Sequence, residues 1–170
     1  QDSAILWNGI EDSSETETDI PSLILQAKSM FSQSGIKFNE NAEIELSHHF
    51  GIQRFREFGA LIVTCYNNEY AKKLILQYPR QKHPYHHHKL KKESFQLLWG
   101  DMELVVDGIS IQLELGQIYT VERGSWHKFS SLHGAIVEEI STSAISSDSY
   151  YEDPKISKLA REKRKTQITF

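Results

Sequence analysis

From residue 60 to residue 141 the chain is a succession of short apolar runs, and this pattern constrains the fold more than any other feature. The runs are 60–67, 71–78, 94–100, 102–108, 109–115, 118–124, 127–131 and 135–141. Turn residues such as Gly100, Gly108 and Gly116 separate them, and no crossover helix lies between them. Many short strands at even spacing predict an all-β sandwich or barrel.

A helix is predicted ahead of these strands. Asp19 and Pro21 form a start signal, and Gly35 is a plausible stop. The preceding residues, 1–20, are acidic and rich in Ser and Thr apart from a short "AILW". We interpret them as an N-terminal arm or linker whose apolar part docks on the domain or on a second copy.

The end of the chain has a different character. Residues 151–170 include "DPKISKLAREKRK", which carries six Lys and Arg residues and has a helix start at Asp153 and Pro154. We interpret this tail as a solvated basic helix end rather than a phosphate-binding segment. The sequence thus predicts an arm (1–20), one domain with an N-terminal helix (21–150) and a short helical or irregular tail (151–170).

Composition excludes several classes of protein. A chain of 170 residues with 39% apolar side chains builds one domain, and its net charge of −4 argues against a nucleic-acid binder. Cys65 is the single cysteine, so it forms no internal disulfide. Because it lies in an apolar run, it is predicted to be a buried strand thiol. No apolar run approaches the roughly 20 residues of a membrane span, and no signal-peptide pattern opens the chain. We therefore predict a cytoplasmic protein without a membrane partner.

The stretch "HPYHHHKLKKESF" holds four of the eight histidines. In a strand, His86 and His88 point to one face and His87 to the other. If Glu93 also faces inward, His127 is the best candidate for a fourth ligand. Three imidazoles and one carboxylate suit Mn, Zn, Fe, Ni or Co, and we expect one divalent ion.

An H-x-H pair alone is common, and the other histidines have simpler interpretations. His48 and His49 are predicted to be a surface or half-buried polar pair. His83 is predicted to be a loop residue, and His133 lies in a turn.

Period-2 alternation places Lys91, Glu93, Phe95 and Trp99 on one face. With Phe129, the two aromatic residues are candidates for lining a substrate pocket, although aromatic residues in strands more often pack in a core. Lys91 is a candidate for holding a substrate oxygen, with a solvated strand-end lysine as the alternative.

The spacing of these residues resembles the motifs of the cupin superfamily. The first motif, H-x-H, three or four residues, E, six residues, G, is matched by His86, His88, Glu93 and Gly100. The second is matched by Gly116, by Gly124 in "ERG" and by His127. Arg80 stands where the first motif has Gly, and Glu122 where the second has Pro. The resemblance implies a jelly-roll barrel, or double-stranded β-helix, that binds its metal through all four ligand positions.

Within the cupins, the chain most resembles the D-lyxose isomerase-like sugar isomerases. The supporting segments are "SGIKFNE", "HHFG", "KKESF", "AIVEEISTS" and "DSYYEDPKI". This resemblance implies a metal-dependent aldose–ketose isomerase with a small-molecule sugar as substrate, Glu139 as the candidate base and Lys91 beside the substrate. Sequence alternation leaves Glu138 as a competitor for the same role. A homodimer is an expectation from the family.

Two other hypotheses remain open at this point. Similar cupin domains are attached to sialic-acid-synthase-like enzymes, so the chain is alternatively a non-catalytic sugar-binding domain of a larger sugar-biosynthesis protein. Cupins with three His and one Glu also perform oxygen chemistry, so a non-haem metal oxygenase is a third hypothesis. Fold alone does not separate these functions.

Overall fold

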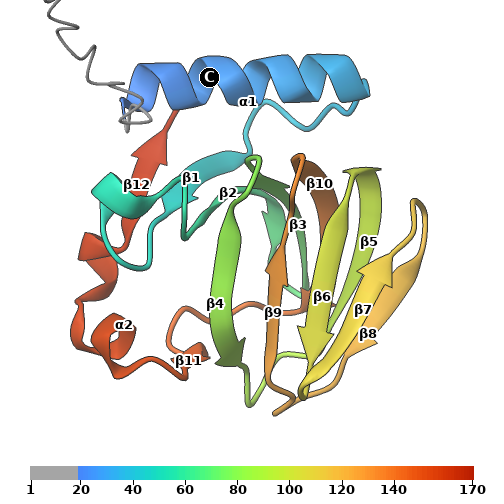
Figure 1. Ribbon diagram of the computed structural model, residues 1–170, viewed down its shortest axis with the longest axis vertical. Coiled ribbons are helices and arrows are strands. Elements are labelled where there is room, and N and C mark those ends of the chain that lie inside the picture. Colours follow the sequence, from blue (N-terminus) through green and yellow to red (C-terminus); the bar gives the residue numbers. More distant parts are fainter. Residues whose placement is uncertain (1–18) are drawn as a thin grey trace, which may run out of the picture.

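The computed structural model describes residues 19–170 (Figure 1). The predicted arm, with its apolar "AILW", therefore lies outside the described residues except for its last two positions. Neither of the two α-helices in the described part has the length and hydropathy of a membrane-spanning segment.

The described residues form short strands with few helices. In chain order the elements are α1 (Ile20–Ser34), β1 (Glu43–Ser47), the 3-10 turn η1 (Ile52–Arg54), β2 (Ala60–Asn67), β3 (Tyr70–Gln77), β4 (Lys82–His87), β5 (Glu93–Gly100), β6 (Met102–Val106), β7 (Ile109–Leu113), β8 (Ile118–Val121), β9 (His127–Ser130), β10 (Ala135–Thr142), β11 (Tyr150–Tyr151), α2 (Pro154–Lys158), the 3-10 turn η2 (Arg161–Lys163) and β12 (Lys165–Ile168). The predicted runs all contribute strands, and β1, β4, β11 and β12 add to them.

The strands form two antiparallel sheets that face each other as a jelly-roll barrel, which confirms the predicted fold class (Figure 1). The seven-stranded sheet has the order β12-β1-β2-β3-β10-β5-β8, and the five-stranded sheet has the order β11-β4-β9-β6-β7. Strands adjacent in a sheet are often distant in sequence, as β3 and β10 are. Such pairing closes a space between the sheets into which side chains of both project.

Helix α1 covers the outer face of the seven-stranded sheet. It begins after Asp19, has Pro21 in its first turn and ends at Gly35, whose φ of 70° is left-handed. The Asp19 side chain does not cap the helix; it accepts a hydrogen bond from Ser22 instead. The helix buries one face against strands β1 to β3, in a helix-side cluster that includes Leu23, Ala27, Met30, Phe31, Leu46, Leu61, Leu76, Tyr78 and Ile136.

A second apolar cluster fills the space between the two sheets. It is called the barrel cluster here and includes Ile75, Phe95, Leu97, Met102, Leu104, Val121, Phe129 and Val137. Along β3, Leu74 and Leu76 belong to the helix-side cluster while Ile75 belongs to the barrel cluster. This alternation is the period-2 arrangement of a strand that is buried on both faces.

The basic segment at the end of the chain packs along the sheet instead of forming only a tail. Helix α2 begins at Pro154 as predicted, and the Asp153 side chain accepts a hydrogen bond from the Lys155 amide. The sequence did not predict β12, which pairs antiparallel with β1 and places Lys165 opposite Ser47. Figure 1 shows this red segment returning along β1 toward α1.

One departure from the cupin motifs, Arg80, leaves its turn intact. Arg80 has a φ of 63°, so this arginine adopts the left-handed conformation for which the motif has glycine. Non-glycine residues pay roughly 1–2 kcal/mol for that conformation. Gly100, which matches the motif, requires glycine for two reasons. Its φ of 84° is left-handed, and a Cβ there would collide with the Gly134 carbonyl.

Candidate metal centre

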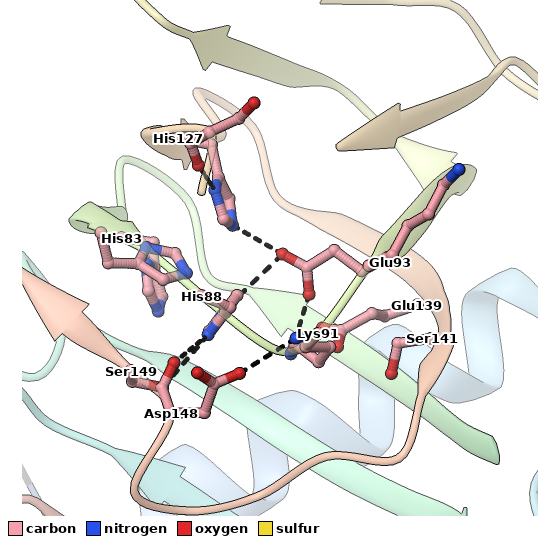
Figure 2. A network of polar contacts seen from close by, with 12 residues as sticks. His83, His88, Lys91, Glu93, His127, Glu139, Ser141, Asp148 and Ser149 are labelled. Atoms are coloured by element: carbon pink, nitrogen blue, oxygen red, sulfur yellow. Dashed lines mark hydrogen bonds and ion pairs between the residues drawn. The ribbon is translucent and has the colours of Figure 1, made fainter. Parts of the chain in front are cut away.

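The four side chains expected to hold a metal converge between the two sheets. His86 comes from β4, His88 follows that strand, Glu93 begins β5 and His127 begins β9. One ligand atom from each residue lies within 4.8 Å of the others, and all four residues are buried. Figure 2 shows Glu93 reaching toward His127 and His88. Two sheets and three strands thus contribute to one centre.

Local strand geometry explains the histidine arrangement. His86 faces the barrel interior across from its register partner His127, with ring centroids 4.1 Å apart. His87 points the opposite way, where its ring stacks on Tyr150 at 5.1 Å. The alternation predicted for the histidine run is therefore confirmed.

The turn after β4 is held by Asp148. Its carboxylate accepts hydrogen bonds from the backbone amides of Lys89, Leu90 and Lys91, at 3.0–3.2 Å. Its backbone carbonyl is 2.9 Å from Nδ1 of His88. Asp148 therefore fixes both the turn between β4 and β5 and the ring of one candidate ligand.

Each candidate histidine has its Nδ1 atom on a backbone carbonyl. The acceptors are Pro84 for His86, Asp148 for His88 and Ser125 for His127, each at 2.9 Å. Because a carbonyl only accepts, Nδ1 is the donor in all three rings. A neutral ring then has a lone pair on Nε2, which is the tautomer that a metal ligand requires.

Two buried acceptor atoms meet without a hydrogen bond at the centre. Nε2 of His127 and Oε1 of Glu93 are 2.6 Å apart, and neither has a hydrogen-bond partner among the described residues. With Nδ1 of His127 donating to a carbonyl, both atoms present lone pairs, and their contact is repulsive. A proton or a metal ion between them removes this repulsion. Two further imidazoles at the same point favour the metal ion.

The ionisation states suit such an ion. Burial lowers the pKa of His86 well below its ordinary value, and burial together with the charge of Lys91 lowers the pKa of His88 to about 4. Burial alone would raise the pKa of Glu93, but Lys91, His127 and His88 together outweigh burial and hold the pKa well below its ordinary value. Neutral imidazoles and an ionised carboxylate are the forms that bind metals.

Lys91 lies between two carboxylates. Its Nζ is 2.8 Å from Oε2 of Glu93 and 2.9 Å from Oε1 of Glu139, and all three side chains are buried. Burial alone would lower the pKa of Lys91, but Glu139 and Glu93 reverse the direction and raise it. Lys91 is therefore a buried cation and not the solvated lysine of the alternative interpretation.

The tertiary structure also decides which glutamate of β10 faces the barrel. Glu139 lies inside, beside Lys91 (Figure 2). Glu138 lies on the outer face, with its carboxylate 3.6 Å from Nζ of Lys72. The candidate base is thus placed at the centre and its competitor is excluded from it.

The aromatic candidates separate into two groups. Phe95 and Phe129 are buried in the barrel cluster and line the inner cavity. Trp99 does not: it packs against the helix-side cluster, and its placement in the pocket was wrong. An irregularity in the pairing of β5 with β10 makes Leu97 the partner of Val137 and Trp99 the partner of Ile136. The extra residue of this β-bulge turns Trp99 to the other face.

Three histidines that were expected in a loop or near the surface are buried: His48, His49 and His83. His83 is not a loop residue: it lies in β4, stacks on Phe129 at 4.5 Å and lines the inner cavity, and burial lowers its pKa to about 3. His49 is also buried and not at the surface, with its ring 4.5 Å from that of His83. The pairing of β4 with β9 is irregular between His83 and His86, so the rings of His83 and His86 both lie inside. Strict alternation along the strand does not predict this.

Two adjoining cavities surround the centre. The inner cavity, about 80 Å³, is lined by the candidate ligands His86, His88 and Glu93 together with Lys91 and Glu139. The second, here called the vestibule, has a volume of about 390 Å³. Both cavities are lined by Lys73, His88, Lys91, Ser149, Tyr151 and Lys165. The vestibule therefore lies directly beside the inner cavity.

Known proteins provide an independent comparison for this fold. No family model matches the chain. Among solved structures, the chain superposes on the L-ribose isomerase of Acinetobacter sp. DL28 with a TM-score of 0.67 at 15% identity, over 81% of this chain and 92% of that one. The L-ribose isomerase of Geodermatophilus obscurus gives a TM-score of 0.65 at 14% identity, over 80% and 92%. The chain therefore shares the barrel fold of these two isomerases.

Curated sequences give the narrower similarity. The chain is 29% identical to a D-lyxose ketol-isomerase of Thermofilum sp. (strain ex4484_79), over 71% of this chain and 82% of that protein. It is 28% identical to the D-lyxose ketol-isomerase of Cohnella laeviribosi, over 76% and 88%. The chain is therefore similar in sequence to two sugar ketol-isomerases, as the sequence motifs indicated.

Proposed function

We propose that this protein is an aldose–ketose isomerase that uses one divalent metal ion and moves a proton between neighbouring sugar carbons through an enediol. The observation that carries the proposal is the pairing of Glu139 with Lys91 beside the candidate ligands, 2.9 Å from Nζ to Oε1. The relatives named D-lyxose ketol-isomerase and L-ribose isomerase support the same reaction. D-Lyxose and L-ribose are accordingly the first sugars to test.

The proposed metal ligands are His86, His88, Glu93 and His127. A bound divalent ion supplies a positive charge that stabilises the developing enediolate and orients the substrate oxygens. Mn²⁺ is our first expectation, and the same donor set also suits Zn, Fe, Ni and Co.

Glu139 is the proposed base. Its carboxylate takes the proton from the carbon beside the carbonyl, and the electron pair of the broken C–H bond forms the enediol double bond. The same carboxylate then returns the proton to the neighbouring carbon, while a proton moves between the two substrate oxygens. No atom is gained or lost, and a single positioned carboxylate suffices for both transfers.

Lys91 orients this base and also donates a hydrogen bond to the substrate. In the free protein its ammonium group contacts both Glu139 and Glu93, which keeps the base aimed at the inner cavity. A lysine has three donors, so the third remains for a substrate oxygen when a sugar enters. Phe95 and Phe129 form an apolar wall that limits water around the reacting carbons.

Solvent deuterium exchange tests the proposal directly. Chelator-treated protein is incubated in D₂O with a panel of aldoses and ketoses, with and without added Mn²⁺, and loss of the C–H signal is followed by NMR. We expect metal-dependent exchange with at least one sugar and formation of the isomer. Sugar binding without exchange would instead favour a non-catalytic domain, and oxygen uptake with iron would favour an oxygenase.

The cytoplasmic location, the homodimer and membership of a larger protein stay predictions.

A further inference from the structure

We propose that the vestibule binds a phosphate group at the far end of the sugar, so that the substrate class is a sugar phosphate. This inference rests on the proposed isomerase function and extends it. The basic segment 155–165 supplies most of the cations that line the vestibule. Of its cations, Arg161, Arg164 and Lys165 line the vestibule, and Lys73 of β3 lines it as well.

The positive charges of the vestibule are not balanced by its carboxylates. Glu45 is paired with Lys165 at 2.7 Å, and the Asp148 carboxylate is occupied by three backbone amides. Among the lining carboxylates this leaves Glu43 to set against Lys73, Arg161 and Arg164. An anion that enters the vestibule therefore meets a surplus of positive charge in a partly enclosed space.

Two of these cationic groups form no hydrogen bond or ion pair in the described part of the chain, and a third has one buried nitrogen without a hydrogen-bond partner there. Within residues 19–170, no hydrogen bond or ion pair is formed by the ammonium group of Lys73 or by the guanidinium group of Arg161. Nε of Arg164 is buried without a hydrogen-bond partner, while its guanidinium group lies 5.2 Å from the ring centroid of Tyr151. Burial lowers the pKa of Lys73, with Glu139 acting in the opposite direction. A buried donor without an acceptor is costly, and an anionic ligand relieves that cost.

The sizes of the two cavities set the orientation of the ligand. The inner cavity of about 80 Å³ has room for the reacting end of a sugar, since one water takes about 30 Å³ of the liquid. The rest of the sugar must then extend into the vestibule of about 390 Å³. Lys73 and Lys165 line both cavities, so they lie where the far end of the sugar leaves the inner cavity.

The arginine and lysine side chains that line the vestibule favour phosphate as the bound anion. Arginine presents a planar fork of donors that matches phosphate oxygens, and lysine supplies a compact charge. The relationship of Lys73 to the base also matters: it is the register partner of Glu139 on the neighbouring strand. The anion site and the proposed base are thereby fixed relative to each other by adjacent strands.

Equilibrium binding to the metal-free protein tests this inference without turnover. Calorimetry compares D-lyxose, D-lyxose 5-phosphate and inorganic phosphate, for the unmodified protein and for Lys73→Gln, Arg164→Gln and Lys163→Gln. Lys163 belongs to the same basic segment but is exposed and does not line the vestibule, so it is the matched control. We expect the sugar phosphate to bind at least about tenfold more tightly than the free sugar, and inorganic phosphate to compete with it. Each vestibule variant should weaken sugar phosphate binding by about tenfold, and the control should not.

Equal affinity for the free and phosphorylated sugars would overturn the inference. So would an equal loss of affinity in all three variants, because that pattern reflects only the net charge of the segment. If this binding pattern is found but neither D-lyxose 5-phosphate nor any free sugar of the panel exchanges its proton in the presence of metal, the isomerase proposal fails while the phosphate site stands. Two independent vestibule variants keep the test valid if one of them does not fold.

Discussion

Strand β10 contributes to both faces of the seven-stranded sheet, and the two faces differ in chemistry. Ile136 packs in the helix-side cluster under α1, whereas Glu139 reaches into the barrel beside Lys91. The helix-side cluster is apolar apart from Tyr78, whose hydroxyl donates to the Leu23 carbonyl at 2.6 Å. The barrel side instead buries three histidines, a lysine and two glutamates around one point. One set of strands thus uses one face for stability and the other for the proposed reaction.

This division suggests that substitutions on the two faces have separable effects. Removal of the Glu139 charge on the barrel side should abolish activity with little loss of stability, because Lys91 keeps its ion pair with Glu93 and no buried charge is left unpaired. A change on the helix side should lower stability and leave the chemistry of the folded molecules unaltered. The following three experiments test that separation.

The largest effect is expected for Glu139→Gln. Loss of a general base costs about 10²–10⁴-fold in rate, so deuterium exchange and isomer formation should fall by that factor. Glu138→Gln is the matched control, since it changes the neighbouring residue of the same strand on the outer face. Metal content, measured by elemental analysis, should be the same in both variants. Comparable activity losses in the two variants would contradict the assignment of the base.

Leu23→Ala should have the opposite effect. Leu23 is fully buried in the helix-side cluster, and such truncations cost about 2–5 kcal/mol. The free energy of unfolding, measured by chemical denaturation, should fall by that amount, while kcat of the folded fraction stays constant. Leu25→Ala on the same helix is the control because Leu25 is 72% exposed. A marked loss of kcat in Leu23→Ala would mean that the two faces are coupled.

A smaller effect on the free energy of unfolding is expected at acid pH. It should depend on His49, whose ring lies against His83 of the inner cavity. The pKa of His49 lies well below its ordinary value because the ring is buried and neighbouring cationic groups act in the same direction. The unfolded chain then binds a proton below about pH 6.5 that the folded chain does not, so stability is present above this pH and falls as the pH decreases. One such histidine contributes a slope of about 1.4 kcal/mol per pH unit.

Chemical denaturation of the chelator-treated protein at pH 7, 6 and 5 measures this slope. His49→Phe retains an aromatic ring against His83 and Tyr151 and should reduce the slope by about one proton. The exposed His133→Gln is the control and should leave the slope unchanged. An unaltered slope in His49→Phe would mean that other groups account for the acid sensitivity.

The features that followed from sequence are those with a short period or a fixed motif. The all-β class followed from the evenly spaced strands, and the jelly-roll barrel followed from the resemblance to the cupin motifs. The convergence of His86 with His88 followed from alternation within one strand. Glu93 and His127 were found from the spacing of the motifs. Each lies at the start of its strand, β5 or β9, next to a turn that is visible in the sequence. Trp99 and His83 were misplaced because a β-bulge or pairing irregularity adds a residue that alternation does not count.

The sequence by itself determined which residue types meet at the candidate centre, because alternation and turn positions act over a few neighbouring residues. Only the tertiary structure decided that Glu139 and not Glu138 faces inward, since the face of a strand depends on its partners in the sheet. It also decided that the basic end of the chain lines a vestibule. That arrangement depends on the pairing of β12 with β1, whose residues are more than a hundred positions apart, so no local pattern encodes it.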